Sequence, residues 1–381
     1  MNIGKADLSI TLGVEEEFFL VDPDTRDMLA DPDPRIFEYC QEHAGPHKVV
    51  PEMLRSQIET NTRVCNSVAE VREALGETRR LVCDAAAGRG AAVIASSTHP
   101  FAVWQAQLTT PRKRYEDFEM TYQEAVRRYL VGGMHVHAGF GDPDARVRVM
   151  TALRRYLPIL LALSTSSPFN HGNNTGYKSY RLCLIGVLPR TSLPNALYSA
   201  TDYEQLLDNY RRMNFISDGS ELWWDIRPSQ HYPTVELRIC DLCTRLEDAM
   251  CIVALYACLI RMLLRQYRAG RLPEEPLTEI IAENRWLAQR YGVLGFLGNT
   301  DDGGRTDIAD LVAQMVETLG EDAEALDCER ELRHALEIVA NGSGADRQTD
   351  HFRLRILEGD SDREALVSVV DQILAETRTG I

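Results

Sequence analysis

Four short segments of the sequence carry Glu, His, Gln or Arg at alternate positions, and these residue types can bind metal ions or phosphate. The segments are Gly13–Phe18, Ser56–Thr60, Met134–Ala138 and Thr234–Ile239. Side chains two positions apart on a β-strand point to the same face. If each segment is a strand, four polar pairs share a face: Glu15 and Glu17, Gln57 and Glu59, His135 and His137, and Glu236 and Arg238.

Polar pairs of this kind favour bound divalent cations over a solvated sheet face. Carboxylates and imidazoles that lie together repel one another or lack partners unless a cation binds them. Mg²⁺ and Mn²⁺ prefer carboxylate oxygens, and Mn²⁺ accepts histidine more readily. For any single segment, a solvated face is the better interpretation. Because four segments agree, the sequence predicts roughly two or three metal ions on about five or six ligands, which suits a nucleotide triphosphate.

The elements that position these pairs follow from the hydrophobic pattern of residues 1–245. Short alternating runs predict strands at Ile10–Val21, Ser56–Thr60, Ala91–Ser96, Met134–Phe140, Leu222–Ile226 and Val235–Ile239. Amphipathic stretches predict helices at Val68–Ala87, Pro111–Leu130, Ala145–Leu163 and Asp202–Ile216. Strands and helices do not alternate regularly. This order favours an α+β fold, with an antiparallel sheet and helices on one side, over a doubly wound parallel sheet.

Residues 246–381 are predicted to be mainly helical. The expected helices are Leu246–Arg268, Leu277–Tyr291, Thr306–Leu319, Ala323–Ala340 and Ser361–Thr377. Two stretches rich in Gly, Asn and Asp are expected to be loops, Asn299–Gly304 and Asn341–Gln348. No repeat or low-complexity linker separates the two parts of the chain. We therefore expect residues 1–381 to form a single catalytic domain.

A long polar turn, Ser166–Gly176, leads into a segment that contains Lys178 and Arg181. Basic groups that follow such a turn can hold a carboxylate or a phosphate, although a surface loop with stray charges is an equal alternative. The turn lacks the GxxxxGK[ST] pattern of a P-loop, and no GxGxxG follows an early strand. The neighbouring aromatic pair Trp223–Trp224 is more typical of core packing than of a binding platform.

The composition limits the partners and the compartment. The 381 residues are 44% hydrophobic and carry a net charge of −16, which disfavours nucleic acid and anionic membranes as general partners. The start of the chain lacks the apolar stretch of a signal peptide, and no apolar run is long enough to span a bilayer. Nine cysteines form no complete set of pairs, and the lone Cys240–Cys243 spacing has no second pair to complete a zinc site. We expect a cytoplasmic protein.

Six motifs in order resemble the bacterial carboxylate–amine ligase family, also called glutamate–cysteine ligase type 2. They are Gly-Val-Glu-Glu-Glu-Phe at 13–18, Gln-Ile-Glu-Thr-Asn-Thr at 57–62, Gly-Met-His-Val-His at 133–137, Ser-Ser-Pro-Phe-Asn at 166–170, Thr-Val-Glu-Leu-Arg-Ile-Cys-Asp at 234–241 and Glu-Asn-Arg-Trp at 283–286. Each motif alone is weak, but six in sequence are specific. Together they span most of the chain, from about residue 10 to residue 290.

The resemblance implies a glutamine-synthetase-like fold, in which a curved antiparallel sheet forms a funnel-like active site with helices outside. It also implies ATP, Mg²⁺ or Mn²⁺, and small-molecule substrates. The metal ligands would be Glu15, Glu17, Glu52, Glu59, His135 and Glu236. Arg238 and Glu236 match catalytic residues, with Arg238 expected to contact phosphate. The candidates for substrate or phosphate contact are Lys178, Arg181, His137 and Asn170.

The expected reaction is ATP-driven amide formation through an acyl phosphate. Glutamate is the expected acyl donor, and cysteine or another amine is the acceptor. Two alternatives are a metal-dependent hydrolase built on His135 and His137, and a metabolite-binding protein with a silent ligase site. The sequence leaves open the acceptor, whether glutamate is the true donor, the number of metal ions, the oligomeric state (a homo-oligomer included) and the role of the segment after residue 290.

Overall fold

A seven-stranded antiparallel sheet forms the centre of the molecule. The computed structural model describes residues 8–299 and 303–381. The strands lie in the order β10 (Ile226–Pro228), β11 (Thr234–Leu237), β5 (Met134–Gly139), β1 (Thr11–Val21), β3 (Gln57–Asn61) and β2 (Lys48–Pro51), with β4 (Ala92–Ile94) paired to the end of β1. Every pair in this sheet is antiparallel, which confirms the predicted α+β class.

The register of the sheet brings the predicted polar pairs together. On β1, Glu15 lies opposite His135 of β5, and Glu17 lies opposite Glu59 of β3. Glu236 of β11 lies opposite His137. Because the strands alternate, the apolar residues between these positions point to the other face and join the hydrophobic core; they include Val14, Ile58, Val136 and Leu237.

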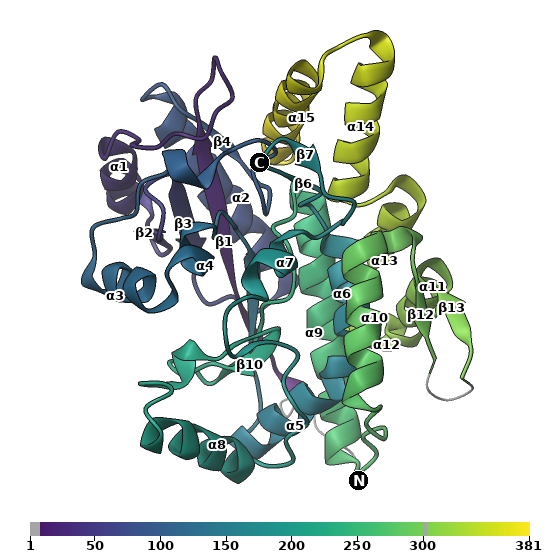
Figure 1. The fold of residues 1–381 in the computed structure, drawn as a ribbon. Coiled ribbons are helices and arrows are strands. Elements are labelled where there is room, and N and C mark those ends of the chain that lie inside the picture. The colour runs from purple at the N-terminus through teal and green to yellow at the C-terminus, as the bar shows by residue number, and fades with distance from the viewer. Residues whose placement is uncertain (1–7, 300–302) are drawn as a thin grey trace.

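Helices cover the apolar face of the sheet (Figure 1). The long helix α9 (Leu246–Arg268) is almost wholly buried, and α2 (Val68–Ala87) and α5 (Pro143–Leu153) pack beside it. Side-chain caps begin several of these helices. Ser67 accepts a hydrogen bond from the amide of Glu70 at the start of α2, and Asp142 accepts one from Ala145 at the start of α5.

The remaining helices surround this central layer. They are α1 (Arg35–His43), α3 (Lys113–Tyr122), α4 (Glu124–Arg127), α6 (Leu157–Ser164), α7 (Arg181–Ile185), α8 (Ala200–Arg212), α10 (Thr278–Tyr291), α11 (Ile308–Thr318), α12 (Gly320–Leu326), α13 (Glu329–Asn341), α14 (Gly344–Glu358) and α15 (Asp362–Thr377). Short two-stranded sheets join β6 (Phe169–Asn170) to β7 (Asn173–Asn174), β8 (Thr191–Ser192) to β9 (Trp223–Trp224), and β12 (Phe296–Gly298) to β13 (Arg305–Asp307). Residues of α3 and α7 lie over the polar face of the sheet, so helices are not confined to one side as predicted.

Three predicted helices are each divided in two. Pro111–Leu130 becomes α3 and α4 because Gln123 has a φ of 52°, which a helix cannot accommodate. Ala145–Leu163 is divided near Pro158, whose ring favours the first turn of the new helix α6. Ala323–Ala340 is interrupted at Asp327, which is left-handed. The predicted strand Leu222–Ile226 is likewise divided into β9 and β10.

The loop predicted at Asn341–Gln348 is wrong from Gly344 onward, because α14 begins there. The Ser343 hydroxyl accepts a hydrogen bond from the amide of Asp346, whose carboxylate accepts one from the amide of Ser343. This capping box starts a helix within residues whose composition is typical of a loop. Gly342, with a φ of 85°, makes the turn between α13 and α14.

The other predicted loop, Asn299–Gly304, lies partly outside the described residues, since residues 300–302 are not among them. Residues 1–7, part of the stretch 1–11 that lacks the apolar run of a signal peptide, also lie outside them. Within residues 8–299 and 303–381, no helix has the length and apolar content that a membrane crossing requires.

Candidate active site

A cavity of about 1170 Å³ lies over the polar face of the sheet. It is bounded by strands β1, β3, β5, β10 and β11 and by helices α3 and α7. Nine residues predicted from the sequence line it: Glu15, Glu17, Glu52, Glu59, His135, His137, Arg181, Glu236 and Arg238. The strand alternation therefore placed the polar pairs on the correct face.

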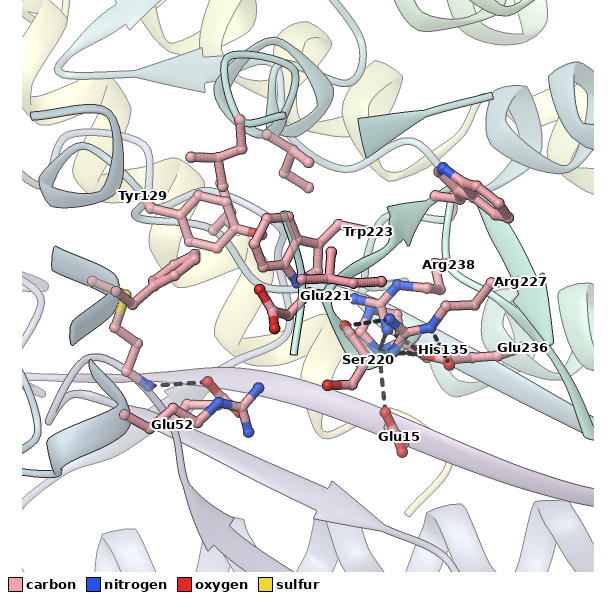
Figure 2. Close-up of a pocket in the computed structure, with 18 of the residues that line it drawn as sticks. Glu15, Glu52, Tyr129, His135, Ser220, Glu221, Trp223, Arg227, Glu236 and Arg238 are labelled. Carbon is pink, nitrogen blue, oxygen red and sulfur yellow. Dashed lines mark hydrogen bonds and ion pairs between the residues drawn. The ribbon is translucent and has the colours of Figure 1, made fainter. Parts of the chain in front are cut away.

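Glu15, His135 and Glu236 form a group that could hold one cation. One ligand atom from each lies within 4.8 Å of the others. His135 Nδ1 is 3.1 Å from Glu15 Oε2 and 4.0 Å from Glu236 Oε1. His137 Nε2 lies 3.3 Å from the other oxygen of Glu15, so both histidines of β5 face this carboxylate. Figure 2 shows Glu15 and Glu236 directed toward His135 from neighbouring strands.

The charge states of this group suit a metal ligand set. Burial raises the pKa of Glu15, but hydrogen bonds from His135 and His137 outweigh burial and leave the pKa well below its usual range. For Glu236, burial is likewise outweighed, by the charges of Arg238 and Arg227, and its pKa is lowered. Burial lowers the pKa of His135 to about 4, and the charge of Arg238 adds to this effect. Two carboxylates are thus ionised while one imidazole is neutral, as metal ligation requires.

A second group of carboxylates consists of Glu17, Glu52 and Glu59. Burial raises the pKa of Glu17 to about 8, and the charge of Glu52 contributes further. The pKa of Glu59 is also raised well above its usual value, first by burial and then by the neighbouring Glu52. Some hydrogen-bond donors reach these groups: Gly133 N lies 2.8 Å from Glu17, and Asn61 Nδ2 lies 2.6 Å from Glu59. No positively charged side chain forms an ion pair with the three glutamates within the described part of the chain.

The first group fits Mg²⁺ or Mn²⁺, and among the described residues it is the one set of three side chains whose ligand atoms lie close enough to share an ion. These ions prefer carboxylate oxygens, and Mn²⁺ also accepts imidazole. In the second group, buried carboxylates repel one another and are driven toward the protonated form, a cost that a divalent cation would remove. The donor set of this cavity therefore matches the predicted metals.

Two arginines bind Glu236, Arg227 from β10 and Arg238 from just after β11. Arg238 Nη1 donates a hydrogen bond to Glu236 Oε1, and Arg227 Nε donates to Oε2 at 2.8 Å. Arg227 also donates to the carbonyls of Ser220 and Leu222, at 2.6 and 2.8 Å. The sequence prediction missed Arg227, because the predicted strand ended at residue 226. Its position opposite Glu236 in the β10–β11 pair is the signal that could have revealed it.

Arg181 reaches the cavity from the first residue of α7. Its guanidinium donates to the carbonyls of Ile239 and Arg238, at 3.3 and 3.2 Å, while its buried Nε has no hydrogen-bond partner. The buried Asp241 anchors the turn before it, accepting hydrogen bonds from Ser167 Oγ at 2.7 Å and Ser179 Oγ at 2.8 Å. Arg181 is thus fixed in place with one donor group unused.

Lys178 and Asn170 do not line the cavity, so their predicted contact with substrate or phosphate has no support in their positions. Lys178 Nζ lies 2.7 Å from Asp346 Oδ1, and this ion pair ties the turn to α14 instead. Asn170 lies in the short hairpin of β6 and β7, opposite Asn173. The sequence showed that a basic residue follows the turn, but alternation could not show which one faces the sheet.

The arrangement of the sheet and helices is similar to that of solved ligase structures. Two solved structures share this fold. Glutamate–cysteine ligase from Francisella tularensis, in complex with AMP, has a TM-score of 0.70 and 11% identity, covering 97% of this chain and 89% of that chain. A bifunctional glutathione synthetase from Pasteurella multocida has a TM-score of 0.69 and 16% identity, covering 97% of this chain and 53% of that chain.

The chain belongs to glutamate–cysteine ligase family 2. The model of that family matches residues 11–372. A relative from Rhodospirillum rubrum, provisionally named glutamate–cysteine ligase 2, is 43% identical over 372 residues, which cover 97% of this chain and 96% of the relative. A relative from Jannaschia with the same provisional name is 40% identical and covers 97% of each chain. The resemblance inferred from six motifs is confirmed, and with it the prediction of a ligase.

Proposed function

We propose that this protein is an ATP-dependent ligase that joins the carboxylate of glutamate to an amine through an acyl phosphate. One observation carries the proposal: a single cavity contains the Glu15, His135 and Glu236 group, three further glutamates, and the two arginines that pair with Glu236. Bound cations and arginines are the groups that phosphoryl transfer needs to balance developing negative charge. Membership of the ligase family and the names of the relatives support the same reaction class.

The metal ligands divide between two ions in this proposal. Glu15, His135 and Glu236 would hold one, and the second group, Glu17, Glu52 and Glu59, would hold another. When bound, Mg²⁺ or Mn²⁺ supplies charge neutralisation for the phosphates of ATP. His137, which faces Glu15 from the same strand, is the candidate for a contact to substrate or phosphate.

The arginines position the reacting groups. A carboxylate oxygen of the donor attacks the γ-phosphorus in line, and ADP leaves. Arg238 stabilises the charge on the transferring phosphoryl group, and its ion pair with Glu236 fixes the orientation of its guanidinium. Arg181, whose side chain lines the cavity, binds a carboxylate of the donor.

The second half of the reaction needs a proton acceptor. The amine nitrogen attacks the acyl carbon, inorganic phosphate leaves, and the amine gives up a proton. Glu221, a further carboxylate that lines the cavity and is not among the proposed metal ligands, is a candidate to accept that proton. We also propose that residues 1–381 act as one catalytic unit, since a single hydrophobic core includes Val14 of β1 and Ile338 of α13.

Coupled ADP release tests the proposal. The purified protein should release ADP from ATP only when Mn²⁺ or Mg²⁺, glutamate and an amine are present together. Omission of any one component should abolish the release, which a metal-dependent hydrolase would not require. Equal ADP release without glutamate would contradict the proposal, and so would ATP binding without turnover for every carboxylate and amine supplied.

A further inference from the structure

The cavity continues beyond the metal-ligand groups, and its two ends differ in chemistry. Toward β10 and β11 it carries Arg227, Arg238 and the group around His135. Toward β2 and β3, where Met53 follows Glu52, the wall is aromatic and apolar. We call this second region the aromatic end; it consists of Met53, Tyr115, Phe118, Tyr122, Tyr129, Leu188 and Trp223.

The rings of the aromatic end pack against one another and form a fixed surface. The ring centroids of Phe118 and Tyr122 are 4.9 Å apart, and those of Phe118 and Trp223 are 5.4 Å apart. Both pairs have edge-to-face geometry, a favoured arrangement of aromatic rings. Figure 2 shows Tyr129 and Trp223 on the side of the pocket away from Arg227, Arg238 and His135.

Arg190 contacts two of these aromatic side chains, Tyr122 and Trp223. Its guanidinium carbon lies 5.3 Å from the centroid of the Trp223 ring. Its Nη2 donates a hydrogen bond to the Tyr122 hydroxyl at 2.8 Å, and its Nε donates to the carbonyl of Glu221 at 3.2 Å. The Tyr122 hydroxyl and one face of the Trp223 indole therefore already have partners, which leaves the apolar ring edges of Phe118, Tyr122 and Trp223 for a ligand.

Charge decides which substrate lies at each end. The triphosphate of ATP needs cations, and Arg227 and Arg238 place them at the β10–β11 end. Glutamate carries two carboxylates and gains nothing from an apolar wall. The acceptor is the substrate that remains for the aromatic end, which lines the same cavity as the arginines.

We propose that the acceptor is a primary amine with an aromatic or other large apolar substituent, which binds against Phe118, Tyr122 and Trp223. This inference rests on the proposed ligase function and specifies its second substrate. A buried aromatic ring contributes far more apolar contact than a thiol or a methyl group. The aromatic end thus selects by size and apolarity, while the metal-ligand carboxylates and arginines serve any acceptor.

Acceptor kinetics test the proposal directly. With ATP, Mn²⁺ and glutamate, kcat/KM would be measured for phenylalanine, 2-phenylethylamine, cysteine and alanine. We expect the two aryl amines to exceed cysteine and alanine by at least about tenfold, the discrimination that a fitted apolar pocket provides. The order of phenylalanine and 2-phenylethylamine then shows whether the acceptor is an amino acid or a simple amine.

Single substitutions distinguish a role of the aromatic end in acceptor selection from a role in folding. Phe118→Ala should remove most of the preference for aryl amines and leave the KM for ATP unchanged. Phe118→Leu, which keeps an apolar side chain and guards against a folding defect, should retain part of the preference. The matched control is Phe352→Ala, because Phe352 is also half-buried but packs against Phe169 outside the cavity; it should keep the full preference.

Hydroxylamine distinguishes failure of this inference from failure of the ligase proposal, because it needs no side-chain pocket. If the wild type forms the glutamyl hydroxamate but uses aryl amines no better than cysteine or alanine, the acceptor inference alone is wrong. A rise in the KM for ATP in Phe118→Ala would also overturn it, since the aromatic end would then bind adenine. If neither hydroxamate nor ADP forms, both proposals fail.

Discussion

Glu16 and Glu17 are adjacent on β1 but face opposite sides of the sheet. Glu16 is fully buried on the helix-covered side, where Arg79 Nη2 and Nε lie 2.5 and 3.0 Å from its two oxygens. The same arginine donates to the carbonyls of Cys243 and Thr244, so each of its three guanidinium nitrogens donates a hydrogen bond. Glu17 faces the cavity beside Glu52 and forms no ion pair with an arginine or lysine in the described part of the chain.

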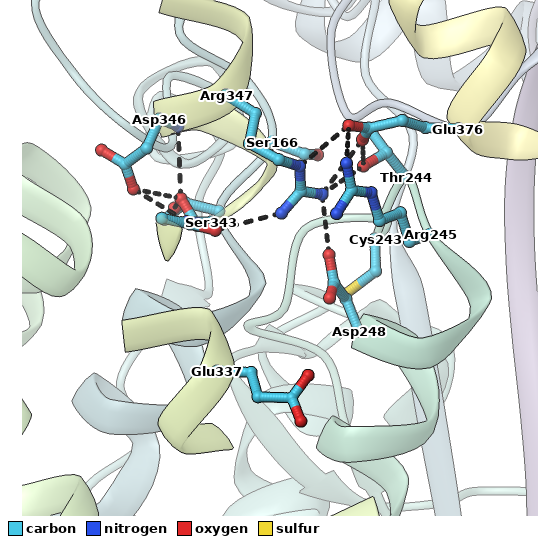
Figure 3. A network of polar contacts seen from close by, with 12 residues as sticks. Ser166, Cys243, Thr244, Arg245, Asp248, Glu337, Ser343, Asp346, Arg347 and Glu376 are labelled. Carbon is cyan, nitrogen blue, oxygen red and sulfur yellow. Dashed lines mark hydrogen bonds and ion pairs between the residues drawn. The ribbon is translucent and has the colours of Figure 1, made fainter. Parts of the chain in front are cut away.

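The difference shows that two carboxylates of the same type, adjacent in the chain, differ in their partners according to the face of the sheet. A second buried region also pairs its carboxylates with arginines. In the network of Figure 3, Arg347 Nη2 lies 2.8 Å from Asp248 and its Nε lies 2.9 Å from Glu376, while Arg245 also pairs with Glu376 at 2.7 Å. These contacts join α14 and α15 to α9. Glu16, Asp248 and Glu376 hold the fold together through arginine partners. The cavity carboxylates Glu17 and Glu59 lack such partners and are suited to cations, while Glu236 pairs with Arg227 and Arg238 inside the cavity.

Glu236→Gln should have the largest effect on activity. Glu236 is both a proposed metal ligand and the anchor of Arg238, so its loss removes two contributions together. We expect the rate of ADP release to fall by at least about a hundredfold, since even residues behind a metal ligand cost about 10–100-fold. Glu337→Gln, a surface carboxylate on α13, is the control and should retain the full rate. Unchanged turnover in Glu236→Gln would contradict the site assignment.

Glu16→Gln and Glu17→Gln test the comparison by stability. Glu16→Gln leaves Arg79 buried without its counter-charge and should lower the free energy of unfolding by about 3–5 kcal/mol. Glu17→Gln should not lower the stability of the metal-free protein, because burial and Glu52 already disfavour the charged form of Glu17. Urea unfolding in the presence of a chelator measures both. Equal destabilisation by the two variants would remove the distinction between the faces.

His99 lies outside the cavity and is a buried structural group whose protonation should make the stability of the protein depend on pH. Its Nε2 lies 2.9 Å from the carbonyl of Arg26, and its Nδ1 accepts from the amides of Phe101 and Ala102, so the neutral ring is satisfied. Burial lowers its pKa from 6.5 to about 4. The unfolded chain therefore binds the proton more readily, and stability is lost as the pH falls through this window.

The expected loss from His99 is about 3 kcal/mol between pH 6.5 and pH 4. Urea unfolding across this range should show a shallower decline in His99→Gln than in the wild type. The exposed His43 provides the control, and His43→Gln should follow the wild-type curve. Parallel curves for all three proteins would show that His99 does not control the acid response.

Arg181→Lys should have the smallest effect. Lysine keeps the positive charge but cannot reproduce the planar contacts to the carbonyls of Arg238 and Ile239. We expect the KM for glutamate to rise about tenfold, which corresponds to about 1.4 kcal/mol, with little change in the KM for ATP. A larger change in the KM for ATP than in the KM for glutamate would show that Arg181 contacts the nucleotide and not the donor.

The sequence predicted much of the fold and most of the candidate site, because both depend on strand alternation. Period-two spacing placed Glu15, His135 and Glu236 on one face, and the resemblance to the ligase family added Glu52. Strand alternation could not predict contacts between segments that are far apart in the chain. Arg227 becomes visible only through its pairing opposite Glu236, and Lys178 was misplaced because its partner, Asp346, lies 168 positions away in the chain.

The aromatic end and α14 escaped prediction for related reasons. Trp223 was expected to be in the core, but it lines the cavity because α3 brings Phe118 and Tyr122 to it. The start of α14 has the composition of a loop, and only the reciprocal hydrogen bonds of Ser343 and Asp346 reveal a helix. Contacts between distant segments and local caps both outweigh composition.

The central claim is that the unpaired cavity carboxylates bind divalent cations, and equilibrium dialysis with Mn²⁺ tests it most directly. The wild type and the Glu337→Gln control should show the same saturable binding. The double variant Glu17→Gln/Glu59→Gln should lose binding at the second carboxylate group, with affinity there reduced at least about tenfold. Absence of saturable binding to the wild type, or equal binding by all three proteins, would contradict the claim.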